Sequence, residues 1–179
     1  APENVYGYSK KMMEMMFMEH HNPVTKFVCT RFANVANSKG SVIPFWKNLL
    51  QNNQPLKLTD PNMNRLMFSK QDSAKLIHHA IDKAFNTDKP FVLSKLMDSV
   101  NMLDLAKHMS DKIEIVGPRP GEKTDEDLIS EKEIPYTVVE DGYVSIFNEK
   151  QSPDKNLKAP HSSFTAPKMG KDQLNKLIL

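Results

Sequence analysis

Segments with helical spacing alternate with short apolar segments, and this alternation most restricts how the chain can fold. The first helix is expected at 8–21, where Asn22-Pro23 ends it. A buried strand is expected at 25–32, and a polar loop at 33–42 follows it. Further helices are expected at 44–52, 72–85, 101–109 and from 125, and further strands at 56–58, 65–68, 91–94 and 113–116. This order predicts an α/β fold, in which ligands bind beyond the carboxyl ends of the strands.

Tyr6 and Lys10 form the most informative residue pair. An offset of four places both side chains on one face of a helix. A lysine ammonium one turn away favours the phenolate, so the tyrosine becomes a usable proton acceptor. The other three tyrosines have no lysine at this offset. The alternative is an exposed tyrosine and lysine at the start of a helix, without a catalytic role.

Four segments of the chain resemble those of the UDP-N-acetylglucosamine 4,6-dehydratases, which are extended short-chain dehydrogenases. Residues 4–10 resemble the N-x-Y-G-x-[ST]-K active-site segment. Residues 31–44 are similar to R-Y-G-N-V-x-G-S-R-G-S-V-I-P, residues 59–65 to T-D-P-x-M-T-R, and residues 117–123 contain R-P-G-E-K. The segments occur in the order of the family, and residues 165–179 resemble its ending.

The resemblance implies the C-terminal part of a Rossmann-type extended short-chain dehydrogenase with a small α/β substrate lobe. Residues 1–35 would end the dinucleotide-binding domain, and 36–179 would form mainly the substrate lobe, with about 70–95 returning to the Rossmann sheet. No glycine-rich G-x-x-G-x-x-G loop follows a strand in these 179 residues. We therefore expect a longer parent enzyme, with this stretch inactive when alone.

The activity implied by the resemblance is the NAD(P)-dependent 4,6-dehydration of a UDP-N-acetylhexosamine for surface polysaccharide synthesis. Tyr6 would accept the proton of the sugar 4-hydroxyl, and Lys10 would bind the nicotinamide ribose. Phe32 and Ala33 would lie beside the same cofactor, NADP or NAD. The acid and base of the elimination are expected upstream of the tyrosine.

Substrate contacts are also implied by the resemblance. Arg65 and Arg119 would lie near the diphosphate or ribose, because guanidinium forks suit phosphates. The other candidates are Asn34 for a phosphate oxygen, Glu122 for a ribose hydroxyl, and the backbone around Ser41, Val42 and Pro44 for the uracil.

Simpler alternatives exist for three of these residues. Arg65 could be a surface arginine at a strand edge, Arg119 and Glu122 could form a loop ion pair, and Asn34 could occupy a left-handed backbone conformation. Departures from the family pattern, such as Ala33 and Asn37 in place of glycines, leave the hexosamine and the C5 outcome open.

The helix expected at 8–21 is rich in methionine and apolar on nearly every side. Such a helix is expected to be buried all round, partly on the sheet and partly against a second subunit. The resemblance favours a homo-oligomer formed through this helix. The alternative is a core helix of a monomer.

Charge and composition restrict the remaining partners. The net charge of +2 argues against nucleic acid or an anionic membrane as partner, and no apolar run is long enough for a membrane span. The single cysteine, Cys29, suits a reducing cytoplasm and is expected to be an inert core thiol. The adjacent histidine pairs, 20–21 and 78–79, do not have metal-ligand spacing. The acidic residues at 125–127 are expected to complement a helix dipole.

Two other functions stay open at this point. A related sugar-nucleotide epimerase or reductase would share Tyr6 and Lys10 without eliminating water. A non-catalytic, truncated lobe that binds a nucleotide sugar or a partner chain is the third possibility.

Overall fold

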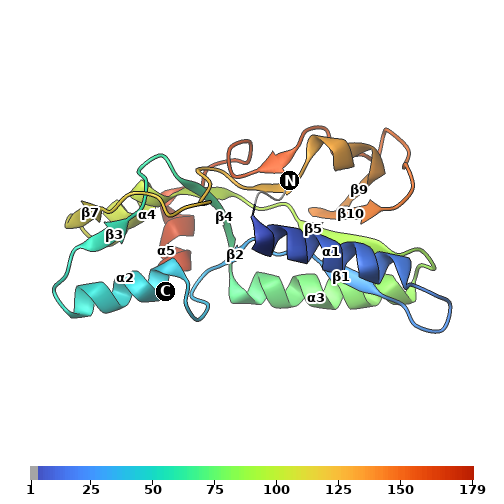
Figure 1. The fold of residues 1–179 in the computed structure, drawn as a ribbon, viewed down its shortest axis with the longest axis horizontal. Coiled ribbons are helices and arrows are strands. Elements are labelled where there is room, and N and C mark those ends of the chain that lie inside the picture. The colour runs from blue at the N-terminus through green and yellow to red at the C-terminus, as the bar shows by residue number, and fades with distance from the viewer. Residues whose placement is uncertain (1–3) are drawn as a thin grey trace. The chain divides into compact units, whose positions relative to one another are not determined.

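The computed structural model describes residues 4–179, which form two compact units (Figure 1). Unit 1 contains the described residues up to Phe32, together with Asp72–Leu96 and Asp127–His161. Unit 2 contains Ala33–Gln71, Met97–Glu126 and Ser162–Leu179. Residues 1–3, which belong to the predicted dinucleotide-binding segment, lie outside the described residues.

Unit 1 is built on a four-stranded mixed sheet with the order β1-β5-β10-β9. Strand β1 (Val28–Thr30) pairs in parallel with β5 (Phe91–Lys95), which pairs antiparallel with β10 (Tyr143–Phe147). Strand β9 (Thr137–Glu140) forms the far edge. The parallel β1–β5 pair and the helices beside it confirm the predicted α/β class.

Helices cover both faces of this sheet. Helix α1 (Val5–Glu19) contacts β1 and β5 on one face. On the other face, the helix α3 (Lys70–Phe85) stacks its His79 ring on Tyr143 of β10, with the ring centroids 4.2 Å apart. Strand β5 is buried at four consecutive positions for this reason. A strand covered on both sides lacks alternation of apolar and polar residues, as the apolar run around Phe91 predicts.

Apart from Met18, the methionines of α1 lie outside the face that packs within unit 1, so the alternative of a methionine-rich core helix of a monomer is wrong. The stripe at positions 7, 11, 14 and 18 is the shielded one, with Met18 fully buried. Met12, Met13, Met15 and Met16 are exposed. The reason is electrostatic: Lys11 and Glu14 find charged partners inside unit 1, so these two residues take the inner positions.

Unit 2 contains two small sheets and three helices. Strand β4 (Asn64–Phe68) lies between β2 (Asn34–Val35), parallel to it, and β6 (Ser99–Asn101), antiparallel to it. Strand β3 (Leu56–Leu58) pairs in parallel with β7 (Ile113–Ile115). The helices are α2 (Val42–Gln51), α4 (Met102–Met109) and α5 (Lys171–Ile178).

The core of unit 2 gathers around α2. Ile43, Trp46 and Leu49 are buried on one face of this helix, as their spacing requires, against Leu56 and Leu58 of β3. The Trp46 indole is fully buried and its Nε1 donates to the Lys57 carbonyl oxygen at 2.8 Å. Trp46 therefore contributes both a large buried side chain and a hydrogen bond to this core.

Trp46→Phe should lower the free energy of unfolding by about 2 kcal/mol, since it leaves a cavity and removes the hydrogen-bond donor to the Lys57 carbonyl. Urea denaturation followed by circular dichroism measures this. Phe45→Leu is the matched control, because Phe45 is the preceding residue of α2 but is 47% exposed. We expect the control to change the value by less than about 0.5 kcal/mol. Equal losses in both variants would contradict the packing described.

The helix expected from residue 125 is wrong. Residues Asp127–Ile129 form the strand β8, with Leu128 and Ile129 buried, and a short 3-10 helix η1 (Glu131–Tyr136) follows. The acidic residues before the strand have other partners: Asp125 accepts a hydrogen bond from the Ser163 hydroxyl at 2.9 Å. Their charges therefore serve side-chain contacts rather than a helix dipole. Strand β11 (His161–Ser162) lies where the chain passes from unit 1 to unit 2.

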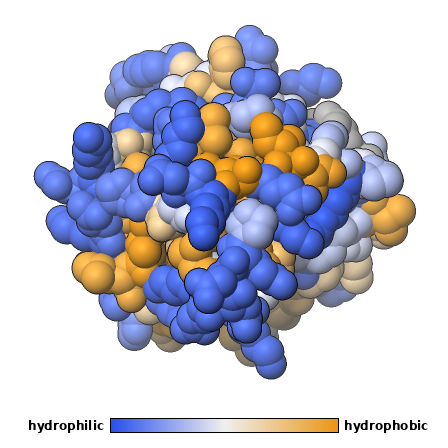
Figure 2. Space-filling view, turned by 90° about the vertical axis from the view of Figure 1, so that its left-hand side faces the viewer, coloured by the Kyte–Doolittle hydropathy of each residue, from blue (hydrophilic) through white to orange (hydrophobic). Residues whose placement is uncertain are grey.

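The surface of the α2, β3 and β7 region is mostly hydrophilic, and apolar side chains interrupt it in small groups (Figure 2). Exposed large apolar residues of unit 2 include Phe45, Ile115, Val116 and Phe164. Small groups of this kind are common on protein surfaces and do not mark an interface by themselves. Among residues 4–179, no helix combines the length and the apolar character needed to cross a membrane.

Candidate functional site

Tyr6 and Lys10 lie together at the start of α1. Asn4 caps this helix, because its Oδ1 accepts from the Gly7 backbone N–H at 2.8 Å. The Tyr6 side chain is 72% exposed, and the Lys10 Nζ lies over its ring, 5.3 Å from the centroid. The expected pairing on one helix face is therefore present, and both groups are open to solvent.

The segment that joins β2 to α2, together with the first turn of that helix, holds three of the predicted substrate residues. Asn37 and Gly40 have positive φ angles of 56° and 80°, and they turn the chain into the helix. Ser41 occupies the N-cap position of α2, with its hydroxyl donating to the Ser38 carbonyl at 2.8 Å. Val42 and Pro44 belong to the first turn and are half-buried, as is usual for a proline there.

Arg65 lies on β4 and is 8% exposed, so the alternative of a surface arginine at a strand edge is wrong. Its Nη1 donates to the carbonyls of Asn64 and Thr124 at 2.8 and 3.1 Å, and its Nη2 donates to that of Lys123 at 2.8 Å. The Nε lies 3.5 Å from Glu126 Oε1. These contacts tie β4 to the segment at 123–126.

Asn34 lies on β2 and is absent from the positions with a left-handed backbone, so that alternative is also wrong. Its amide nitrogen donates to the Leu66 carbonyl and to Glu126 Oε2, both at 3.1 Å. Both amide hydrogens therefore have partners within unit 2. Glu126 joins Asn34 to Arg65.

Arg119 and Glu122 meet in the loop after β7, but not as an ion pair. The Glu122 Oε2 accepts from the Arg119 backbone N–H at 3.0 Å, and its Oε1 lies 3.9 Å from the Arg65 guanidinium. The Arg119 side chain is exposed and has no hydrogen bond or ion pair to residues 4–179. Of the predicted phosphate ligands, Arg119 is the one whose side chain is available.

The structure thus groups the predicted residues by unit. Asn34, Arg65 and Glu122 form one polar cluster in unit 2, while Ser41, Val42 and Pro44 lie at the start of α2. Tyr6 and Lys10 lie at the start of α1 in unit 1. Phe32, which is 40% exposed, ends a segment of unit 1, and the half-buried Ala33 begins unit 2.

One charged cluster of unit 1 was missed by the sequence analysis. The guanidinium of Arg31 contacts both oxygens of Glu14 and both oxygens of Glu133, and Lys11 Nζ lies 2.6 Å from Glu14 and 3.5 Å from Glu133. Charged residues at positions 11 and 14, within a stripe of spacing 7, 11, 14 and 18, were the available signal. The methionines, more numerous and more apolar, concealed it.

Two groups of this cluster have shifted pKa values. Burial opposes the charge of Glu133, but hydrogen bonds and attraction from Arg31, with further hydrogen bonds from Ser130, lower its pKa to about 2. Burial likewise opposes the charge of Arg31, while Glu133 and Glu14 raise its pKa. Nearby, burial and then the charge of Glu14 raise the pKa of the half-buried Cys29 thiol.

Replacing Glu133 with glutamine should reduce the decrease in the free energy of unfolding that the wild-type protein shows as the pH falls from 6 to 2. A carboxyl whose pKa falls from 4.5 to about 2 on folding stabilises the fold above pH 4.5, and this contribution is lost as the pH falls toward 2. After allowance for solvent screening it amounts to about 2 kcal/mol. Urea unfolding between pH 2 and 6 measures the slope. Glu131→Gln, at an exposed position of the same 3-10 helix, should keep the wild-type slope, and a wild-type slope in Glu133→Gln would contradict this assignment.

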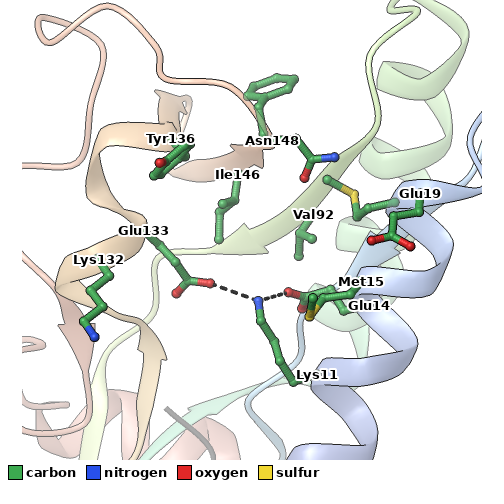
Figure 3. A pocket seen from close by; sticks show the side chains of 12 residues that line it. Lys11, Glu14, Met15, Glu19, Val92, Lys132, Glu133, Tyr136, Ile146 and Asn148 are labelled. Atoms are coloured by element: carbon green, nitrogen blue, oxygen red, sulfur yellow. Dashed lines mark hydrogen bonds and ion pairs between the residues drawn. The ribbon is translucent and has the colours of Figure 1, made fainter.

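A cavity of about 430 Å³ opens beside this cluster in unit 1 (Figure 3). Val92 and Ile146 of the sheet lie on one side of it, and α1 and η1 contribute charged side chains. Its full lining is Lys11, Glu14, Met15, Met18, Glu19, Val92, Lys132, Glu133, Tyr136, Ile146, Phe147 and Asn148. None of the residues predicted for catalysis or substrate binding lines this cavity.

His21 has structural contacts through both of its ring nitrogens. The ring nitrogens of His21 lie 3.2 Å from the Phe27 carbonyl oxygen and 3.1 Å from that of Asp88. Within the described part of the chain, no group of three histidine, cysteine or acidic side chains is arranged to hold a metal ion.

Comparison with solved structures identifies the type of fold. The X-ray structure of Pen from Bacillus thuringiensis superposes with a TM-score of 0.87 at 25% identity, over 99% of this chain and 58% of that one. The fold is therefore an α/β fold of the extended short-chain dehydrogenase type.

A family model described as polysaccharide biosynthesis protein matches residues 1–147. The chain belongs to this family.

The names of the curated relatives give two different activities. The UDP-N-acetylglucosamine 4,6-dehydratase (inverting) of Campylobacter jejuni is 29% identical over 176 residues, which cover 94% of this chain and 50% of the relative. The UDP-glucose 4-epimerase of Rickettsia bellii is 33% identical over 141 residues, covering 74% of this chain and 41% of the relative. Across four curated relatives the chain spans between 24% and 57% of the relative's length.

Proposed function

We propose that this chain is the part of a sugar-nucleotide 4,6-dehydratase that carries its Tyr6–Lys10 pair and its substrate lobe. The reaction would convert UDP-N-acetylglucosamine to a 4-keto-6-deoxy sugar nucleotide for surface polysaccharide synthesis. The observation that carries the proposal is the exposed pair at the start of α1 in a member of the polysaccharide biosynthesis family. The Campylobacter dehydratase, which aligns with 94% of the chain, supports the choice of activity.

Tyr6 and Lys10 suit a site for NADP or NAD. Within residues 4–179 the Lys10 ammonium has no hydrogen bond or ion pair, so its donors remain for ribose hydroxyls. From the same turn of α1, Tyr6 would accept the proton of the sugar 4-hydroxyl as the general base. When bound there, a nicotinamide would supply the hydride chemistry that the reaction needs at C4 and C6 of the sugar. Phe32 and Ala33 would line this cofactor from the end of β1.

Unit 2 would bind the UDP group. Arg119 has an exposed guanidinium without a partner among residues 4–179, and we assign the diphosphate to it. The side chains of Arg65 and Asn34 already donate to backbone carbonyls and lie against Glu126. We therefore assign them the role of holding the loop at 119–126 in place. Glu122 would accept a ribose hydroxyl, and the backbone around Ser41, Val42 and Pro44 would line the uracil.

These assignments give each of the two units its own role. Unit 1 would be the end of the dinucleotide-binding domain, and unit 2 the substrate lobe. The exposed methionines of α1 would meet the same helix of a second copy, which gives a homo-oligomer. We place the protein in the cytoplasm, where UDP-sugars and reduced thiols such as Cys29 are found.

Epimerisation is the second candidate function. The Rickettsia relative named UDP-glucose 4-epimerase favours it, and a Tyr–Lys pair serves hydride transfer at C4 in that reaction as well. The two reactions differ in their product: an epimer has the mass of the substrate, whereas a dehydratase product is lighter by one water.

The product of the complete reading frame should therefore be incubated with UDP-N-acetylglucosamine and each nicotinamide cofactor. We expect a new sugar nucleotide that is lighter by one water and reacts with carbonyl reagents. A product of unchanged mass would support the epimerase. No turnover of any UDP-N-acetylhexosamine would favour the non-catalytic lobe.

A further inference from the structure

We infer that Arg31 is a positioning residue for the Tyr6–Lys10 pair, acting through Glu14 and Glu133 to fix helix α1. This inference rests on the proposed function of that pair. It adds a requirement that the proposed function does not contain: the helix that carries the catalytic groups must be held by a specific, half-buried ion cluster.

The backbone of Arg31 is anchored to the sheet. Its N–H donates to the Leu93 carbonyl at 2.8 Å, and its carbonyl oxygen accepts from the Ser94 hydroxyl at 3.2 Å. Both partners belong to β5, which is buried on both faces. The guanidinium therefore projects from a fixed point.

Every N–H donor of the Arg31 guanidinium is engaged. Its Nε and Nη2 donate to the two oxygens of Glu14 at 3.2 and 2.7 Å. Its Nη1 and Nη2 donate to the two oxygens of Glu133 at 3.2 and 2.9 Å. The fifth hydrogen is donated from Nη1 to the Leu128 carbonyl at 2.7 Å. The planar fork thus binds two carboxylates, each through both of its oxygens.

Glu14 transmits this constraint to the catalytic pair. It lies on α1 one turn after Lys10 and two turns after Tyr6, with only 15% of its side chain exposed. A contact that uses both carboxylate oxygens restricts sliding of the helix along its axis and rotation about that axis. Displacement of a catalytic group by about 1 Å can cost on the order of a hundredfold in rate. The cluster is therefore able to control turnover without touching substrate.

Arg31→Lys is the informative substitution, because lysine retains the charge but cannot bind both carboxylates as a fork. Lys83→Gln is the matched control. Lys83 forms a 2.8 Å ion pair with Glu140 in the same unit, and its side chain is 19% exposed, against 17% for Arg31. That pair joins α3 to β9 and does not involve α1.

Both variants should be made in the product of the complete reading frame and compared by hydrogen exchange and by steady-state kinetics. In Arg31→Lys we expect the amides of residues 7–11 to exchange at least about tenfold faster, with those of α3 unchanged. The kcat should fall by about tenfold to a hundredfold, while the KM for the UDP-sugar changes less than about threefold. Lys83→Gln should leave α1 exchange and kcat at wild-type values.

Unchanged α1 exchange in Arg31→Lys would overturn the inference, and so would faster exchange throughout unit 1, which would indicate a general structural role. Faster α1 exchange with unchanged kcat would overturn it as well. If the wild-type protein turns over no UDP-sugar, the proposed function fails on its own. The exchange measurement then still decides whether Arg31 holds the segment at 7–11.

Discussion

Tyr6→Phe should lower kcat by about a thousandfold or more, with little change in stability or in cofactor affinity. The substitution removes only the hydroxyl to which we assign the 4-hydroxyl proton, and the loss of a general base typically costs a factor of about 10² to 10⁴. The ring remains for the contact with Lys10. Since Tyr6 is exposed, no core is disturbed. Single-turnover formation of the reduced cofactor, followed by its absorbance, measures the hydride step directly.

Tyr8→Phe is the control for this experiment. Tyr8 lies two residues further along α1 and is also exposed, but it points away from the Tyr6–Lys10 face because positions two apart do not share a helix face. We expect wild-type rates. A Tyr6→Phe variant that still reduces the cofactor at more than about a tenth of the wild-type rate would remove Tyr6 from the mechanism.

Arg31→Met should produce the largest loss of stability, about 3–5 kcal/mol at neutral pH. The substitution leaves Glu14 and Glu133 facing each other in a shielded site with Lys11 as the remaining cation. Removing one partner of a shielded ion cluster is costly, because the single charge of Lys11 does not balance two carboxylates. Guanidinium-induced unfolding of the variant and the wild type measures the difference.

The same substitution in a Glu14→Gln/Glu133→Gln background separates charge from packing. With both carboxylates neutral, Arg31→Met should cost only about 1 kcal/mol, because methionine replaces the aliphatic part of arginine and no buried charge is left unpaired. An equal cost in both backgrounds would show that Arg31 stabilises the unit by packing alone, and would contradict its role as the partner of two buried carboxylates.

The elements with strong local signals could be predicted from sequence. The helix α2 has a proline in its first turn and an apolar stripe, and it is observed at Val42–Gln51 where 44–52 was expected. The strand β5 is a continuous apolar run bounded by turns, and its expected start at residue 91 is confirmed. The periodicity of the apolar residues and the turn residues at both ends determine such elements locally, and tertiary contacts do not alter them.

The orientation of α1 could not be predicted in the same way. Its hydrophobic residues occur on almost every side, so composition does not say which face packs against the sheet. The choice is made by Arg31, a residue distant in sequence, which draws Glu14 inward. Strand β8 was missed for a related reason: Asp125 and Glu126 suit the first turn of a helix, but both are hydrogen-bonded to the Ser163 hydroxyl instead.

The candidate site shows the same limit. Motifs identify Tyr6, Lys10 and Arg65 by residue type and spacing, but they do not show which donors are already in use. The guanidinium of Arg65 is engaged by three carbonyls, and the amide of Asn34 by one carbonyl and Glu126. Hydrogen-bond partners are a property of the folded chain, so the assignment of the diphosphate to Arg119 required the structure.

The most direct test of the central proposal is the fate of the hydrogen at C4 of the sugar. UDP-N-acetylglucosamine deuterated at C4 should be incubated with the product of the complete reading frame, and the product examined by mass spectrometry and NMR. We predict loss of one ordinary water and deuterium in the new C6 methyl group, because the hydride removed from C4 returns to C6. A product of unchanged mass with deuterium at C4 would contradict dehydration and establish epimerisation.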